Sequence, residues 1–152
     1  MSTSARTYTT RRLGIVEALV NKLKDIDGTG HFLTNVNENV SPRLKFWDEV
    51  EEFPAIHLNA GAETREYQGG GYKDRFFSIT VRCYVQDEDT VQALDELLED
   101  VETVIEENSR LTYKDRNNTD QNTQQITITS ISTDEGVLEP LGVGEMLIEV
   151  RY

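Results

Sequence analysis

Residues 87–107 carry the pattern that most constrains the fold, because apolar and acidic side chains interleave there at the spacing of an α-helix. The apolar residues recur three and four positions apart and form one stripe: Val91, Leu94, Leu97, Leu98, Val101, Val104 and Ile105. Asp89 or Thr90 is placed to cap the first turn. The segment therefore predicts an amphipathic helix that lays one face on a core and leaves the other outside.

The outer face of this predicted helix holds most of the net charge. The chain of 152 residues has a formal charge of −13, and residues 87–107 contribute −10 of it through ten acids and no base. The remaining residues balance 18 acids against 15 bases. Crowded like charges destabilise a helix unless bases from elsewhere face them. Two interpretations stay open: a solvated face, or a surface that meets a partner.

Length and composition exclude several classes of protein. A chain of 152 residues fits one domain with a core large enough to need no disulfide or metal. Clustered acids argue against a broad nucleic-acid-binding surface and against docking on an anionic membrane. Cys83 is the only cysteine, which excludes a disulfide framework. Neither a membrane-spanning run nor a signal peptide is evident, so we expect a soluble protein made in a cytoplasm.

The first half of the chain predicts one more helix and several short elements. Apolar residues repeat at helical spacing from Thr10 to Asp27, with Gly28 as the C-terminal cap, and residues 1–10 form a flexible arm. Residues 31–36 favour a strand, and residues 37–52 a turn or short helix. The aromatic pair in the latter segment, Phe46 and Trp47, is either core packing or an anchor for a partner.

Strands dominate the rest of the predicted structure. Residues 72–85 alternate apolar and polar side chains, and residues 55–59 form an apolar strand after Pro54, so the two make a hairpin with a long flexible tip at 60–71. Residues 109–125 are polar and predict an exposed loop. Two more strands follow at 126–133 and 146–152, with turns at Asp134–Gly136 and around Pro140 and Gly142.

The order helix, strands, helix, strands predicts an α+β fold. Consecutive strands joined by hairpins favour a mostly antiparallel or mixed sheet of four to five strands over a doubly wound parallel sheet. The two main helices pack against this sheet, in an α/β sandwich-like arrangement. Residues 11–152 are then a single domain that follows the arm of residues 1–10.

Residue types that carry catalysis are few in this chain. His31 and His57 are the only histidines, and His57 lies inside a predicted strand. Cys83 faces inward in the strand pattern, where a small buried side chain is expected. The glycine run Gly69–Gly71 lacks the Lys-Ser/Thr ending of a phosphate-binding loop. We therefore expect no enzyme, no cofactor and no metal site.

The pattern of elements resembles a known family. The first helix is followed by Phe53-Pro54-Ala55-Ile56-His57-Leu58, a glycine-rich hairpin and the strand from Phe77 to Val85. The acidic helix and the endings Ser132–Gly136 and Gly144–Tyr152 complete the pattern. Over residues 11–152 the chain resembles the tail terminator, or tail completion, proteins of long-tailed bacteriophages.

This resemblance implies a structural virion protein that caps the tail tube. It implies a homohexameric ring that ends tube polymerisation at the head-proximal end of the tail and offers a surface to the head-side connector or neck protein. Neither stable nucleic-acid binding nor membrane binding is implied, although DNA passes through the ring. The protein is expected to be made in the host bacterial cytoplasm.

Residues for the ring interface are predicted from this sequence alone. Bases on and beside the hairpin tip are expected to approach the acidic helix of a neighbouring subunit. The predicted interface residues are Arg65, Tyr67, Gly69, Gly70, Gly71, Tyr72, Lys73, Arg75, Glu99, Glu102 and Glu106. An alternative places acids toward the channel, where they keep DNA from sticking. The alternative functions are another head–tail joining or tube protein, and an acidic DNA-mimic inhibitor.

Overall fold

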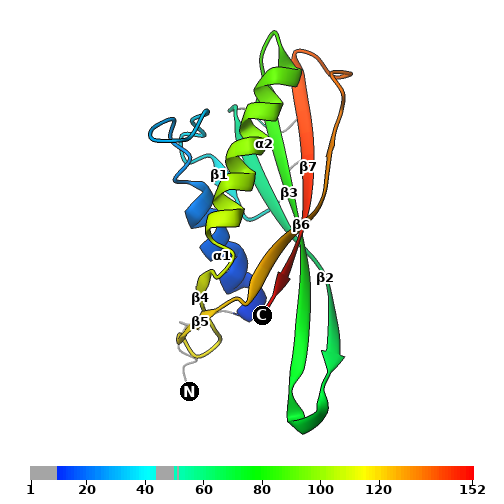
Figure 1. Ribbon diagram of the computed structural model, residues 1–152. Coiled ribbons are helices and arrows are strands. Elements are labelled where there is room, and N and C mark those ends of the chain that lie inside the picture. The colour runs from blue at the N-terminus through cyan, green and yellow to red at the C-terminus, as the bar shows by residue number, and fades with distance from the viewer. Residues whose placement is uncertain (1–9, 44–49, 51) are drawn as a thin grey trace, which may run out of the picture.

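The computed structural model describes residues 10–43, 50 and 52–152. The predicted arm, apart from Thr10, and the pair Phe46 and Trp47 lie outside the described residues. The chain forms an elongated body in which two helices lie on one side of a twisted sheet (Figure 1).

Five strands make the main sheet, in the order β1-β2-β3-β7-β6. The strands are β1 Val40–Ser41, β2 Ala55–Tyr67, β3 Lys73–Gln86, β6 Gln125–Thr133 and β7 Leu141–Arg151. β1 runs parallel to β2, and every other neighbouring pair is antiparallel. The predicted α+β class, with a mixed five-stranded sheet and two main helices, is confirmed.

The core lies between the helices and one face of this sheet. Alternate residues of β3 point into it, from Phe77 to Val85, and the buried residues of β7 pair with them. Helix α2 (Thr90–Glu107) covers β3 and β7, while α1 (Arg11–Leu23) covers β2. The stripe predicted on α2 is buried except for Val91, whose side chain is 49% exposed.

Helix α1 is shorter than its apolar pattern predicts. Thr10 caps it by accepting a hydrogen bond from the Leu13 N–H, and the helix ends at Leu23, before Asp27. The carboxylate of Asp27 accepts hydrogen bonds from the N–H and the hydroxyl of Thr29. The helix itself closes with tighter bonds, in which the N–H groups of Asp25 and Ile26 donate to the carbonyls three residues back, so Gly28 lies beyond the helix and is not its cap.

The strand predicted at residues 31–36 is wrong. These residues form turns, with one isolated bridge between Asp27 and Asn35, because the backbone of Leu33 and Thr34 donates to a side chain on α2. β1 begins only at Val40, after a turn in which Asn37 and Glu38 have positive φ angles.

Two glycines let α2 approach the sheet closely. A Cβ added at Gly142 would lie 3.2 Å from the Cβ of Thr90 on α2 and 2.8 Å from a methyl carbon of Val85 on β3, and one added at Gly144 would lie 3.0 Å from Leu94 on α2. Strand β7 begins at Leu141, earlier than predicted, and Gly142 belongs to the strand and not to the preceding turn. The turn predicted at Asp134–Gly136 is present.

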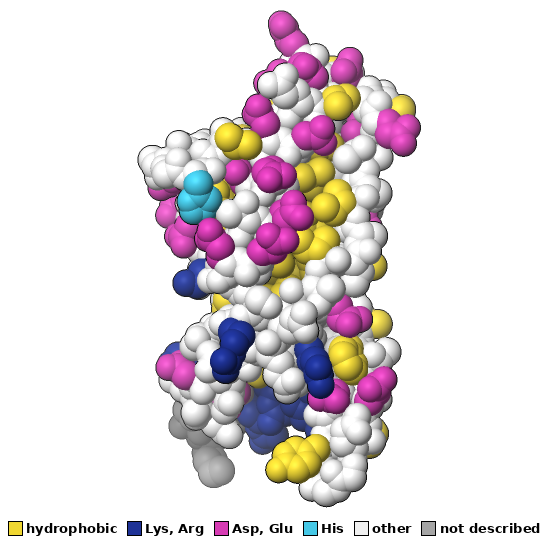
Figure 2. All heavy atoms as spheres, viewed as in Figure 1, with side chains coloured by type: hydrophobic (Ala, Val, Ile, Leu, Met, Phe, Trp, Pro, Cys, Tyr) yellow, Lys and Arg dark blue, Asp and Glu magenta, His cyan; other side chains and the backbone are white. Residues whose placement is uncertain are grey.

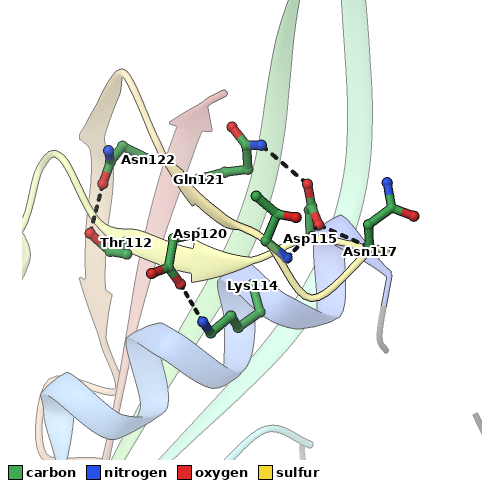
Figure 3. A network of polar contacts seen from close by, with 8 residues as sticks. Thr112, Lys114, Asp115, Asn117, Asp120, Gln121 and Asn122 are labelled. Atoms are coloured by element: carbon green, nitrogen blue, oxygen red, sulfur yellow. Dashed lines mark hydrogen bonds and ion pairs between the residues drawn. The ribbon is translucent and has the colours of Figure 1, made fainter. Parts of the chain in front are cut away.

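The polar segment 109–125 is an ordered hairpin and not the predicted exposed loop. β4 (Thr112–Lys114) pairs antiparallel with β5 (Asp120–Asn122), and Tyr113 is buried against the core. The buried Asp115 organises its turn by accepting hydrogen bonds from the N–H groups of Asn117 and Thr119 and from the Gln121 amide, as Figure 3 shows. Hydrogen bonds, which leave no hydrophobic pattern, thus specify this element.

Candidate functional site

The hairpin of β2 and β3 extends beyond the body as a two-stranded arm (Figure 1). Strand β7 pairs with β3 only as far as Phe76, so the residues between Arg65 and Arg75 have no third strand beside them. The predicted flexible tip at 60–71 is wrong in extent, because β2 continues to Tyr67. The tip itself is a tight turn, in which Gly70 and Gly71 have φ angles of 80° and 83°.

The arm has two chemically different faces. Residues opposite each other in an antiparallel pair lie on the same face, and the register pairs Arg65 with Arg75 and Tyr67 with Lys73. One face is therefore basic and aromatic. Glu66 pairs with Asp74 on the other face, where the Arg151 guanidinium lies 2.9 Å from the Asp74 carboxylate. We call the first the basic face of the arm, made of Arg65, Tyr67, Lys73 and Arg75.

The side chains of the basic face differ in their exposure and in the contacts that they make within the chain. The side chain of Tyr67 is 74% exposed, and the Lys73 ammonium lies 6.0 Å from the centre of its ring. The Arg65 Nε donates to Glu63 at 2.8 Å. Tyr72, at the turn, is 76% exposed. Of the residues predicted for the tip, the tyrosines and Lys73 are thus the most available to a partner.

Arg75 belongs instead to a cluster at the base of the arm. Its guanidinium lies 5.4 Å from the ring of Tyr152, and that of Arg12 lies 4.5 Å from the ring of Phe77. The Tyr152 hydroxyl donates to Glu63. Burial raises the pKa of Glu63, but the hydrogen bonds from Tyr152 and Arg65 and the nearby arginine charges outweigh it and leave that pKa below its ordinary value. The cluster fastens the arm to the body.

The acidic face of α2 contains the other predicted interface residues. Glu99 and Glu106 are exposed and Glu102 is half-buried. Asp100, counted among the surface acids in the sequence, is buried with 1% exposure. Its carboxylate accepts hydrogen bonds from the N–H groups of Leu33 and Thr34 and from the Thr34 hydroxyl. It therefore fixes the loop before β1 to the helix.

A shallow groove lies between this loop and the start of α2. Leu33 and Val91 supply its apolar surface, with side chains 61% and 49% exposed. Polar and acidic residues of α2 and its N-cap surround them: Asp89, Gln92, Asp95, Glu96 and Glu99. None of these four carboxylates forms an ion pair with a described residue. Sequence reasoning missed the groove, because both Leu33 and Val91 fit patterns that predict burial.

The structure does not bring the basic arm and the acidic helix face together within one chain. The arm tip and the first turn of α2 lie at opposite ends of the molecule (Figure 1). Figure 2 shows acidic side chains gathered over the half that contains α2, and Lys and Arg side chains gathered in the other half. Any contact between these two surfaces must therefore involve two copies of the chain.

The side chains of His57 and Cys83, two residue types that often serve in catalysis, are buried in the sheet. His57 is buried and its ring centre lies 5.2 Å from that of Tyr84. Cys83 is fully buried, and burial raises the pKa of its thiol to about 12. Among the described residues, no group of three or more His, Cys, Asp or Glu side chains is placed to hold a metal ion. None of the described helices is long and apolar enough to cross a membrane.

Comparisons with known proteins agree with the resemblance inferred from the sequence. A family profile described as Bacteriophage Tail Tube Terminator Protein matches residues 9–152. Tail tube terminator protein p142 of Escherichia phage T5 is 32% identical over 149 residues, which cover 93% of this chain and 92% of that protein. A chain in the virion of a native gene transfer agent particle is similar in fold, with a TM-score of 0.56, 8% identity and 98% of each chain covered.

The first two comparisons span nearly the whole chain, whereas the third shows a shared fold alone. Members of the matched family are structural proteins of phage tails. The chain therefore belongs to the bacteriophage tail tube terminator family.

Proposed function

We propose that this chain forms a homohexameric ring on the last ring of tail-tube protein. The ring ends tube polymerisation at the head-proximal end of the tail and presents a surface to the connector or neck protein of the head. Synthesis takes place in the host bacterial cytoplasm. DNA passes through the ring without stable binding, and the protein catalyses no reaction. Family membership supports the role at the tube end.

The proposal of a ring rests on the separation of acidic and basic side chains along the subunit. One end is acidic through α2 and the other contains the arginines and lysines of the arm and its base (Figure 2). A contact between unlike ends is heterologous, and repeated heterologous contacts close into a ring when the rotation between copies permits. The same separation opposes the DNA-mimic alternative, which needs acids over most of the surface.

The test is a mixing experiment with purified tail tubes. We expect the protein to bind one end of each tube and to stop further growth, with rings visible by electron microscopy. Light scattering on the isolated protein should show a hexamer at high concentration and low salt, because salt screens exposed charges. Growth of new tubes from this protein would favour a tube protein, and capture of a nuclease or repressor would favour a DNA mimic.

A charge variant tests the role of the arm. Lys73→Glu together with Arg65→Gln removes the basic character of the exposed part of the arm and should abolish ring formation and its salt dependence. Lys22→Glu makes a similar change on the exposed surface of α1 and should assemble normally. Normal assembly of the arm variant would show that ring contacts do not use this surface.

A further inference from the structure

We propose that the arm of one subunit docks its basic face into the groove formed by Leu33 and Val91 on the next subunit. The inference rests on the proposed ring and names the two surfaces that meet in it. The occupant of the groove is a second copy of this chain, with Tyr67 as the apolar anchor and Lys73 and Arg65 beside it. Four observations support this pairing.

The arm presents an aromatic side chain that its own chain does not cover. Tyr67 is 74% exposed on a ribbon with no third strand beside it. A two-stranded ribbon is only marginally stable by itself, so a partner that covers it adds stability. Tyrosine is enriched at the centres of protein interfaces because it combines a large apolar ring with a polar tip. The arm therefore has the features of a docking element.

The groove presents the complementary apolar surface in a fixed position. The Leu33 N–H donates to the two oxygens of the buried Asp100 at 2.9 and 3.0 Å, so the backbone that carries this exposed side chain is held to α2. Val91 lies in the first turn of the helix, which Asp89 caps. A surface that is already ordered loses little conformational entropy on binding.

Charge selects one face of the arm for this groove. The groove has four carboxylates around its apolar surface, from Asp89, Asp95, Glu96 and Glu99. The basic face places Lys73 and Arg65 next to Tyr67, whereas the opposite face carries Glu66 and Asp74, the latter ion-paired with Arg151. Like charges placed across an interface are costly, so the carboxylate of Glu66, which forms no ion pair with a described residue, makes the opposite face the poorer fit. Electrostatic complementarity thus fixes which side of the arm turns inward.

Geometry requires the contact to be between copies. The arm tip and the start of α2, which lines the groove, lie at opposite ends of one molecule (Figure 1), so no chain can fill its own groove. The contact uses two different surfaces, as a ring of identical subunits related by rotation requires. It also makes Arg75, Glu102 and Glu106 peripheral, since Arg75 lies over Tyr152 and neither glutamate lines the groove.

Cysteine crosslinking between two single variants tests the pairing. A tagged Tyr67→Cys chain is mixed with an untagged Val91→Cys chain, under mild oxidation and in the presence of tail tubes. The native Cys83 is buried and does not compete. We expect a tagged–untagged disulfide dimer to form at least about tenfold faster than with Leu147→Cys as the partner. Leu147 is 37% exposed but points away from α2, since its neighbours Met146 and Ile148 face the core.

The outcomes separate this inference from the proposed function. Rings that cap tubes without the Tyr67–Val91 crosslink would overturn the docking and leave the ring intact. Failure of the protein to self-associate or to cap tubes would overturn both. A Tyr67→Ser variant adds a readout that is independent of disulfide chemistry: with its thermal stability unchanged, it should lose ring formation, and normal rings would contradict the proposal.

Discussion

The buried carboxylate of Asp100 accepts two hydrogen bonds from Thr34, at 2.7 Å from its N–H and 2.5 Å from its hydroxyl. The residues are 66 positions apart, on α2 and on the loop before β1. Together with the bonds from the Leu33 N–H to the same carboxylate, this contact links the loop to the helix. It places Leu33 at the groove and is the reason that the loop is not a strand.

Replacing Asp100 by Ala should destabilise the protein by about 2–4 kcal/mol, because it leaves buried N–H and hydroxyl donors without an acceptor. Asp100→Asn should cost less, since the amide oxygen still accepts but the bonds lose their charge. Urea unfolding followed by circular dichroism measures both. Glu106→Gln is the control: removing an exposed acid near the C-terminal end of α2 should change stability by less than about 0.5 kcal/mol. A harmless Asp100→Ala would show that the loop is held by other contacts.

Gly142→Ala should also destabilise the protein, by about 1–3 kcal/mol, because the new methyl overlaps the side chain of Val85. A double-mutant cycle with Val85→Ala gives the test. Removing the Val85 methyls makes room for the new one, so the double variant should be more stable than the sum of the two single effects predicts. Additive effects would mean that the overlap is relieved elsewhere.

Cys83 should be unreactive in the folded protein. Its thiol is fully buried and its pKa of about 12 leaves almost no thiolate at neutral pH. Labelling with an aromatic disulfide reagent should therefore proceed only as fast as the protein unfolds, and should become rapid in urea. The exposed thiol of a Tyr67→Cys variant provides the positive control. Rapid labelling of the native protein in the absence of urea would contradict the burial of this strand.

Sequence reasoning succeeded where a long pattern faces one core. In residues 72–85 and 87–107 most positions repeat the same preference, so single exceptions such as Val91 do not change the prediction. It failed where one polar side chain determines the backbone. Asp27 forms the turn that follows α1, Asp100 holds the loop at 31–36, and Asp115 closes the β4–β5 turn through hydrogen bonds that no periodicity indicates.

The sequence predicted which segments contribute to the candidate site, but not how their side chains are arranged. The glycine run indicates the turn of the arm, and the acids of α2 indicate a charged face. Which side of the arm carries the bases depends on the register that pairs Tyr67 with Lys73, and this register requires the lengths of both strands. The exposure of Leu33 depends on a distant buried acid. Neither property is contained in local sequence.

The hydrogen bond between Tyr152 and Glu63 should make stability fall at both ends of the pH range. Because the pKa of Glu63 is lowered in the folded protein, its contribution is present above the ordinary value of 4.5 and is lost as the pH falls through the folded pKa. The pKa of Tyr152 is raised, first by burial and then by Glu63. Its contribution is present below the ordinary value of 10.0 and is lost as the pH rises through the folded pKa.

Two variants distinguish the loss of stability at acid pH from the loss at alkaline pH. Glu63→Gln should lose about 1–2 kcal/mol at pH 7, because the bonds from Tyr152 and Arg65 no longer end on a charged acceptor, and its deficit should shrink as the wild type is acidified. Tyr152→Phe should reduce the alkaline fall, since no phenol remains to ionise at this position, but should not remove it, because burial also raises the pKa of the Cys83 thiol and of the Tyr113 phenol. Thermal unfolding from pH 3 to pH 11 measures both. If the loss of stability at acid pH is the same in Glu63→Gln as in the wild type, other carboxylates control acid stability. The hydrogen bond between Tyr152 and Glu63 then does not fasten the arm to the body.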